Sequence, residues 1–203
     1  TLDTAERTLG LADGRVLTWD KLLLATGGTP FVPRMEGLDR EGVFTFTTLG
    51  DAQKLAKHVA GARRAVVIGG GLIGISVAEA LVKRHLSVTV VELKDRILNV
   101  ILDEEGSALA DLAVRRAGVE VLTNRTVASV VGRPQNGGAV VSVFLDNGRE
   151  VPCDLLVVAI GVLPRVDLAR GAGIKVNRGI VVDDKMATSA PDVYACGDAV
   201  EAY

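Results

Sequence analysis

The sequence of 203 residues predicts an α/β fold, in which a domain with a parallel sheet and an antiparallel meander is inserted into a second domain of related design. Three observations predict this fold. One passage of the chain occurs twice, continuous apolar runs of strand length alternate with helical patterns, and a glycine-rich turn joins one apolar run to a helix.

The repeated passage occupies residues 13–30 and, 134 positions later and without a gap, residues 147–164. Each copy has a turn, a short strand, an acidic residue, an apolar strand and a Gly-x-x-Pro exit. Seven positions are identical, pairing Gly14 with Gly148, Arg15 with Arg149, Asp20 with Asp154, Leu22 with Leu156, Ala25 with Ala159, Gly27 with Gly161 and Pro30 with Pro164. The run GGGLIG at 69–74 precedes only the second copy, because a counterpart for the first would fall ahead of Thr1. We therefore expect two duplicated dinucleotide-binding domains, of which only the second is whole.

Composition excludes several classes of protein. Hydrophobic residues make up 48% of the chain and the net charge is −2, so a substantial core can form. With only seven aromatic residues and no basic stripe, we expect no nucleic-acid binding. No apolar run is long enough to span a bilayer, and no secretory leader follows Thr1, so we expect no membrane association. Cys153 and Cys196 form no CxxC pair, which favours a cytoplasmic, reducing compartment.

The first elements are marked by turn and capping signals. Asp13-Gly14 predicts a hairpin, and an apolar strand follows at 22–25. Residues 29–46, with several prolines and glycines, are interpreted as a linker. Thr48 and Asp51 form a capping-box pattern, which predicts a helix that ends at Gly61.

The middle of the chain shows a βαβ pattern, with a strand at 65–68, a helix from 72 to about 85 and a parallel strand at 88–91. The pattern then predicts a helix at 104–117, a strand at 120–122, an antiparallel meander from strands at 126–131 and 140–145, a buried strand at 155–159, and short strands at 179–182 and 193–195.

The run GGGLIG follows the strand at 65–68 directly and opens the next helix. We expect Gly69 to permit a tight turn, Gly71 to leave room for a pyrophosphate, and Gly74 to let helix and strand pack closely. Free N–H groups at the start of the helix would then face the phosphates. The dinucleotide-binding residues predicted in this loop are Gly69, Gly70, Gly71, Leu72, Ile73 and Gly74.

Glu92 lies eighteen residues beyond Gly74, at the end of the second strand. A carboxylate there can accept both ribose hydroxyls of an adenosine and would repel a 2′-phosphate, which favours NAD(H) over NADP(H). Lys94 and Arg96 lie close enough to leave this preference open. A glycine-rich turn in another kind of α/β domain is the alternative, and the order of strand, helix, second strand and acid argues against it.

Seven motifs stand in a characteristic order: LLLATGGTP (22–30), VVIGGGLIG (66–74), VTVVE (88–92), RILNVILDEEG (96–106), AGVEV (117–121), VVAIGVLP (157–164) and TSAPDVYACGDAVE (188–201). Together they resemble the FAD-dependent pyridine nucleotide-disulfide oxidoreductase superfamily. Within it, the chain is most similar to NADH oxidases, rubredoxin and ferredoxin reductases, and the flavoprotein part of nitrite reductase large subunits.

The resemblance implies a Rossmann-like NAD-binding domain inserted in a partial FAD-binding domain. Residues 1–47 would form a partial FAD-domain segment and linker, residues 48–163 the NAD-binding domain, and residues 164–203 a C-terminal FAD-domain segment. The family's own FAD-binding GxGxxG unit and its redox cysteines would lie outside this sequence. So would a C-terminal interface domain that commonly carries a dimer contact, and a homodimer is compatible with the resemblance.

The resemblance also implies FAD contacts in the flanking segments. Gly197 and Asp198 would contact the ribityl chain and pyrophosphate of FAD, although Asp198 could also be a simple turn acid. Thr26 and Gly27 would pass near the flavin.

The counterparts of Thr26 and Gly27 in the repeat, Ile160 and Gly161, would pass near the nicotinamide nucleotide. Strand termination is the alternative for both pairs. Many family members carry Glu where this chain has Ser76, which puts a charge-dependent role at that position in doubt.

Other chemically suggestive residues have simpler interpretations. Cys196 is expected to be a small buried residue rather than a redox thiol. His58 and His85 lie near helix C-termini, where a cation suits the dipole. The run at 103–105 resembles a metal cluster but is better explained as the acidic first turn of a helix. No catalytic side chain and no metal site is therefore predicted.

The leading hypothesis is that the chain is the NAD(H)-binding portion of an FAD-dependent NADH oxidoreductase, which transfers hydride from NADH to FAD and on to an acceptor. Oxygen, a disulfide, rubredoxin, ferredoxin and a sirohaem partner are all compatible acceptors. The alternative is an isolated NAD(H)-binding module without turnover, because half of the FAD site would be missing. A plain NAD-dependent dehydrogenase is a third interpretation, against which the repeat argues.

Overall fold

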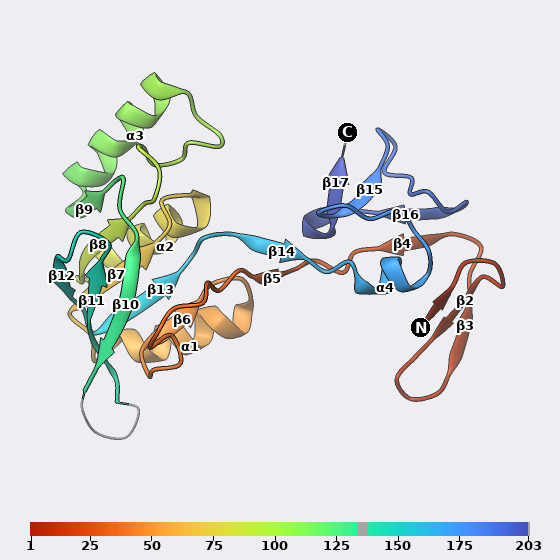
Figure 1. The fold of residues 1–203 in the computed structure, drawn as a ribbon, viewed down its shortest axis with the longest axis horizontal. Helices are drawn as coiled ribbons and strands as arrows, with labels where there is room; N and C mark the ends of the chain where they lie inside the picture. Colours follow the sequence, from red (N-terminus) through yellow and green to blue (C-terminus); the bar gives the residue numbers. More distant parts are fainter. Residues whose placement is uncertain (134–137, 203) are drawn as a thin grey trace. The chain divides into compact units, whose positions relative to one another are not determined.

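The computed structural model describes residues 1–133 and 138–202, which form two compact units (Figure 1). Unit 1 combines Thr1–Thr29 with Val162–Tyr203, and unit 2 is the continuous segment Pro30–Gly161. Residues 30–47 therefore lie with unit 2, whereas the domain bounds implied by the resemblance joined them to the preceding segment. The physical reason is a strand within the expected linker, β6 (Val43–Thr45), which pairs with β13 (Leu155–Val158) of the same unit.

Unit 2 contains a five-stranded sheet in which all neighbouring strands are parallel, in the order β6-β13-β7-β8-β9. Its elements in chain order are β6, α1 (Leu49–Val59), β7 (Arg64–Ile68), α2 (Leu72–Val82), β8 (Ser87–Val91), α3 (Glu104–Arg116), β9 (Val119–Leu122), β10 (Val127–Gly132), β11 (Val140–Leu145), β12 (Glu150–Pro152) and β13. The chain runs outward from β7 through β8 to β9, then returns to place β13 on the other side of β7. The strand order thus reverses between β7 and β13.

The central strands are apolar throughout because both faces of the sheet are covered. Val67 and Val157 face a core formed with helices α1, α2 and α3. Val66 and Leu156 face a second core formed with the antiparallel strands β10, β11 and β12. All four side chains are fully buried. Unit 2 is therefore a three-layer structure of helices, parallel sheet and meander, and it contains the parallel sheet and the antiparallel meander that the sequence predicted.

Helix α1 begins as the sequence predicted. The hydroxyl of Thr48 accepts a hydrogen bond from the N–H of Asp51, and the Asp51 carboxylate accepts one from the N–H of Thr48. This reciprocal pair satisfies two donors that a helix N-terminus otherwise leaves open.

Unit 1 is built from short elements around a separate core. They are β1 (Leu2–Asp3), β2 (Thr8–Gly10), β3 (Val16–Thr18), β4 (Leu22–Leu24), β5 (Gly28–Pro30), β14 (Val162–Pro164), α4 (Asp167–Gly171), β15 (Ile180–Val182), β16 (Val193–Ala195), the 3-10 turn η1 (Gly197–Ala199) and β17 (Val200–Ala202). Strands β4 and β16 are parallel neighbours, and β15 pairs in parallel with β17.

The duplication found in the sequence is also present in the strand pairing. In β2 and β3, Leu9 lies opposite Leu17; in β11 and β12, Val143 lies opposite Val151. Each partner is displaced by the same 134 positions as the repeat, so the two hairpins have the same register. The repeat is therefore a structural duplication, not only a similarity of composition.

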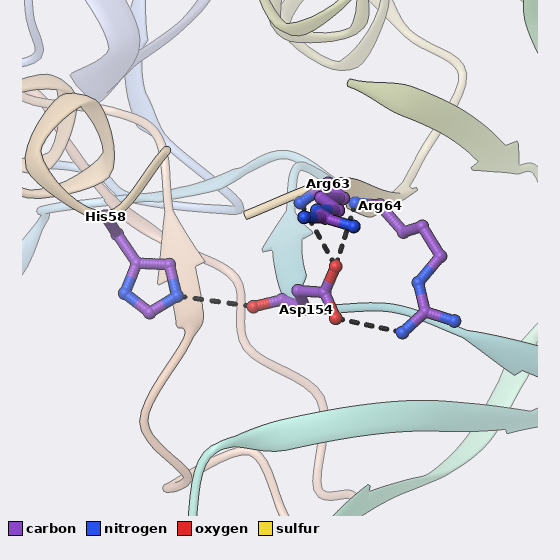
Figure 2. A network of polar contacts seen from close by, with 4 residues as sticks. All are labelled: His58, Arg63, Arg64 and Asp154. Carbon is purple, nitrogen blue, oxygen red and sulfur yellow. Dashed lines mark hydrogen bonds and ion pairs between the residues drawn. The ribbon is translucent and has the colours of Figure 1, made fainter. Parts of the chain in front are cut away.

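Asp154, one of the identical positions of the repeat, ties strand β13 to its neighbour β7 (Figure 2). Its carboxylate accepts hydrogen bonds from the N–H groups of Arg63 and Arg64 at 3.1 and 3.0 Å and from the Arg64 guanidinium at 2.9 Å. The guanidinium bond is the main reason why the pKa of Asp154 lies below its ordinary value. The network lies where β7 and β13 begin, at the end of the sheet opposite their carboxyl ends.

Candidate functional site

The candidate site of unit 2 lies at the carboxyl ends of β7, β8 and β13, where the strand order reverses. In open α/β sheets, ligands bind in the crevice at such a reversal. Residues that follow these three strands line one cavity of about 850 Å³, namely Gly69, Gly71, Leu72, Ile73, Glu92, Leu93, Lys94, Ala159, Ile160 and Gly161. The cavity is of the size that small-molecule and cofactor sites have.

Two glycines of the loop after β7 are required by the fold itself. Gly69 has a φ of +106°, and a Cβ there would collide with the main-chain oxygen of Ala159. A Cβ on Gly74 would collide with the main-chain oxygen of Gly69. These contacts agree with the tight turn and the close packing of helix and strand that the sequence predicted.

Gly71 differs, because no atom beyond Gly71 and its two chain neighbours lies within 4 Å of the position that its Cβ would take. Its φ of −79° and ψ of −175° are accessible to any residue. The fold therefore does not require a glycine here, and the space beside Gly71 opens to the cavity that Gly71 lines.

Helix α2 presents unpaired backbone donors beside this space. Among the described residues, the N–H groups of Gly71, Leu72 and Ile73 have no hydrogen-bond partner. The N-cap residue is Gly71, which has no side chain that could accept from these N–H groups. Unpaired N–H groups at a helix N-terminus, together with the helix dipole, favour an anionic group such as a phosphate.

Gly70 lies behind the loop and does not line the cavity. Its N–H donates to Oε2 of Glu92 at 2.6 Å, and its carbonyl accepts from the N–H of Leu98 at 2.8 Å. Glu92 itself is 8% exposed and lines the cavity, and its Oε1 accepts from the N–H of Lys94 at 2.8 Å. Each carboxylate oxygen keeps a second lone pair, which could accept from a ligand hydroxyl.

The outer part of the cavity combines apolar and cationic side chains, of which the sequence analysis had named only Leu72 and Lys94 for the dinucleotide site. Exposed apolar residues stand around it, among them Leu72, Leu93, Val100 and Ile101, of which Val100 is 91% exposed. Three cationic residues, Arg34, Lys94 and Arg125, line the same cavity, whereas Glu92 is its one acidic lining residue among those described. An apolar rim with an excess of positive charge suits a ligand with an aromatic ring and phosphates.

In unit 1, the structure brings together the four residues expected to contact FAD. Thr26 and Gly27 follow β4, Gly197 and Asp198 follow β16, and β4 and β16 are parallel neighbours. Gly197 has a φ of +72°, which favours glycine, and nothing beyond its chain neighbours lies within 4 Å of its Cβ position. Asp198 is exposed, and its carboxylate forms no hydrogen bond or ion pair within the described part of the chain. The Thr26 hydroxyl instead donates to the main-chain oxygen of Arg165 at 2.7 Å.

The remaining chemically suggestive residues have structural roles: they are buried, bonded to the backbone or part of a helix cap. Burial raises the pKa of the Cys153 thiol to about 12, so this cysteine stays protonated. Nε2 of His58 lies 3.2 Å from the main-chain oxygen of Asp154, an acceptor, and therefore donates to it. Asp103 caps α3 by accepting from the N–H of Gly106, as expected for a helix start. No group of three or more potential metal ligands occurs in residues 1–133 and 138–202. In the same residues, no helix is long and apolar enough to cross a bilayer.

A family model described as pyridine nucleotide-disulphide oxidoreductase matches residues 1–203. Among curated proteins, the chain is 38% identical over 198 residues to an NADH-dependent phenylglyoxylate dehydrogenase subunit epsilon from Aromatoleum evansii, covering 98% of this chain and 46% of the relative. It is 33% identical over 198 residues to a rubredoxin-NAD(+) reductase from Ectopseudomonas oleovorans, covering 98% of this chain and 51% of the relative. The chain thus spans about half the length of these relatives.

Solved structures of similar fold belong to the same kind of oxidoreductase. The ferredoxin reductase for the CYP199A2 system from Rhodopseudomonas palustris superposes with a TM-score of 0.93 at 30% identity, covering 100% of this chain and 49% of that chain. An FAD-dependent pyridine nucleotide-disulphide oxidoreductase from Desulfovibrio vulgaris gives a TM-score of 0.82 at 35% identity, covering 98% of this chain and 52% of that chain.

Proposed function

Because the chain belongs to the pyridine nucleotide-disulphide oxidoreductase family, we propose that it is the NAD(H)-binding portion of an FAD-dependent NADH oxidoreductase. The observation that carries this proposal is Gly71. Its missing side chain leaves open space beside three unpaired N–H groups at the point where the strand order reverses. The backbone conformation and the packing at this position do not require a glycine. A bound pyrophosphate, by contrast, would need the space that the missing side chain leaves.

NADH would bind along unit 2. The N–H groups of Gly71, Leu72 and Ile73 would hold the pyrophosphate, and the second lone pairs of Glu92 would accept the ribose hydroxyls of the adenosine. Gly161 and Ile160, at the end of β13, would border the nicotinamide nucleotide. The cationic residues of the cavity would offset the phosphate charges.

FAD would be held in part by unit 1. Asp198 would accept from a sugar hydroxyl, and Gly197 would let the backbone approach the cofactor closely. Thr26 and Gly27 would border the flavin. When bound, FAD would supply the redox chemistry for hydride transfer from NADH and for electron transfer to an acceptor. The chain's own contribution is to bind and orient the reactants, and no side chain is needed as acid or base.

The names of the relatives support this reaction class. One is NADH-dependent, one is a rubredoxin-NAD(+) reductase, one is a ferredoxin reductase and one is FAD-dependent. We propose an electron-transfer protein or a small molecule as the acceptor of the whole protein, and the residues of this chain favour neither.

The test is the visible absorption spectrum of the purified chain before and after addition of FAD, followed by NADH in the presence of a dye acceptor. A bound flavin spectrum that NADH bleaches, with dye reduction, would support the oxidoreductase. NADH binding without flavin uptake or turnover would instead support an NAD(H)-binding module. A chain that binds neither nucleotide would contradict both.

A further inference from the structure

The Glu92 side chain lies against the glycine loop, and both of its carboxylate oxygens accept hydrogen bonds from backbone N–H groups. Oε2 accepts from the N–H of Gly70 at 2.6 Å, and Oε1 accepts from the N–H of Lys94 at 2.8 Å. The residue is 8% exposed, and both bonds involve an ionisable carboxylate in a largely buried position. Bonds of this kind are about twice as strong as those between neutral groups.

The backbone of Glu92 is fixed as firmly as its side chain. Its N–H donates to the main-chain oxygen of Leu122 at 2.8 Å, and its carbonyl accepts from the N–H of Arg125 at 3.0 Å. Glu92 therefore connects the ends of three strands: β8, which it follows, β9 through Leu122, and β7 through Gly70.

The opposite side of Gly70 is also closed. Its carbonyl accepts from the N–H of Leu98 at 2.8 Å. A Cβ on Gly70 would lie 2.8 Å from Cγ2 of Ile97 and 3.2 Å from Oε2 of Glu92, so the residue fits closely between these two side chains. The peptide before Gly71 is thus held in one position, while the N–H of Gly71 remains unpaired.

We infer that Glu92 is a positioning residue, whose carboxylate fixes the glycine loop so that the unpaired N–H groups of Gly71–Ile73 are already arranged for a pyrophosphate. This inference rests on the proposed function and adds a role that is independent of the ribose. A residue that only accepted ribose hydroxyls would not need both oxygens bound to the backbone. A prearranged loop loses less conformational freedom when the ligand binds, which raises affinity.

Glu92→Gln separates the two roles, because a glutamine has one accepting oxygen and cannot accept from both N–H groups. The probes are NADH and its analogue without the 2′- and 3′-hydroxyls of the adenosine ribose, with dissociation constants from calorimetry. We expect the variant to bind the hydroxyl-free analogue about tenfold more weakly, the size of the loss of one charge-assisted hydrogen bond. NADH should lose at least as much affinity, because its ribose hydroxyls also lose their carboxylate acceptor. If the variant bound the hydroxyl-free analogue as tightly as the unchanged chain does, the positioning role would be refuted.

Glu120→Gln is the matched control. Glu120 accepts from Thr89 and Arg149 on the surface of β9 and does not line the cavity, so both probes should bind this variant as they bind the unchanged chain.

Amide hydrogen exchange of the unchanged chain tests the inference without any variant or ligand. The N–H of Gly70 should exchange much more slowly than the N–H of Gly71, because only the former is hydrogen bonded. Equal, fast exchange at both positions would overturn the positioning role. Failure of the unchanged chain to bind NADH would overturn the proposed function, whereas the exchange rates would still decide the role of Glu92.

Discussion

Replacement of Gly71 by valine should weaken NADH binding while leaving the fold in place. No atom beyond Gly71 and its two chain neighbours lies within 4 Å of the Cβ position, and the backbone angles are accessible to valine. A valine is a poorer N-cap than a glycine, so we expect the free energy of unfolding to fall by no more than about 1 kcal/mol.

The loss of affinity follows from the donors that the valine would cover. A hydrogen bond to a charged group contributes about 1.5 kcal/mol or more, and the N–H groups of Gly71 and Leu72 are both beside the new side chain. Losing both bonds to the pyrophosphate costs about 3 kcal/mol, which corresponds to about a hundredfold in the dissociation constant. Calorimetric titration with NADH measures this change, and urea unfolding measures the stability.

Gly50→Val is the control, since Gly50 also lies in the first turn of a helix, is exposed and does not line the cavity. Its dissociation constant for NADH should equal that of the unchanged chain. A folded Gly71→Val variant with undiminished NADH affinity would refute the assignment of the glycine loop.

Three further predictions concern the surroundings of the site. Gly74→Ala should lower the free energy of unfolding by about 1–3 kcal/mol, because the new Cβ meets the oxygen of Gly69; an unchanged urea midpoint would contradict this close packing. Asp154→Asn should lower the free energy of unfolding by about 1 kcal/mol at neutral pH. The loss is small because the carboxylate is partly exposed and solvent weakens its ion pair with Arg64. The lowered pKa of Asp154 means that its stabilisation is complete above its ordinary pKa of 3.8 and is lost as the pH falls through the folded value. The difference between variant and unchanged chain should therefore shrink on acidification, and a difference that grows at low pH would contradict this sign. Cys153, with a pKa of about 12, should resist iodoacetamide at pH 8 until the chain is unfolded, and rapid labelling at Cys153 itself, distinguished from the half-buried Cys196 by peptide mapping, would be inconsistent with its burial.

The parts of the fold that could be predicted from the sequence are those with strong local or repeated signals. The βαβ unit has continuous apolar strands and a glycine turn, and the repeat has the same offset in sequence and in strand register. Strand β6 was missed, because the surrounding glycines and prolines indicated a linker, although the residue types of Val43–Thr45 are common in strands. In the structure this segment pairs with β13.

The candidate site, too, was predicted only in part from the sequence. The glycine loop and Glu92 were predicted from their spacing, and the structure brings both to the cavity. That Gly70 supports the loop through Glu92 rather than opening to the cavity depends on side-chain orientation, which spacing does not define. Arg34 and Arg125 were missed because they reach the cavity from distant segments, and isolated arginines carry no motif.

The most direct test of the account is a titration of the ¹⁵N-labelled chain with NADH, followed through its backbone amide resonances. We predict saturable shifts that are largest at Gly71, Leu72 and Ile73, whose N–H groups are unpaired in the structure. Saturable binding with unchanged resonances at these three residues, or no binding at millimolar NADH, would contradict the central claim that this loop holds the pyrophosphate.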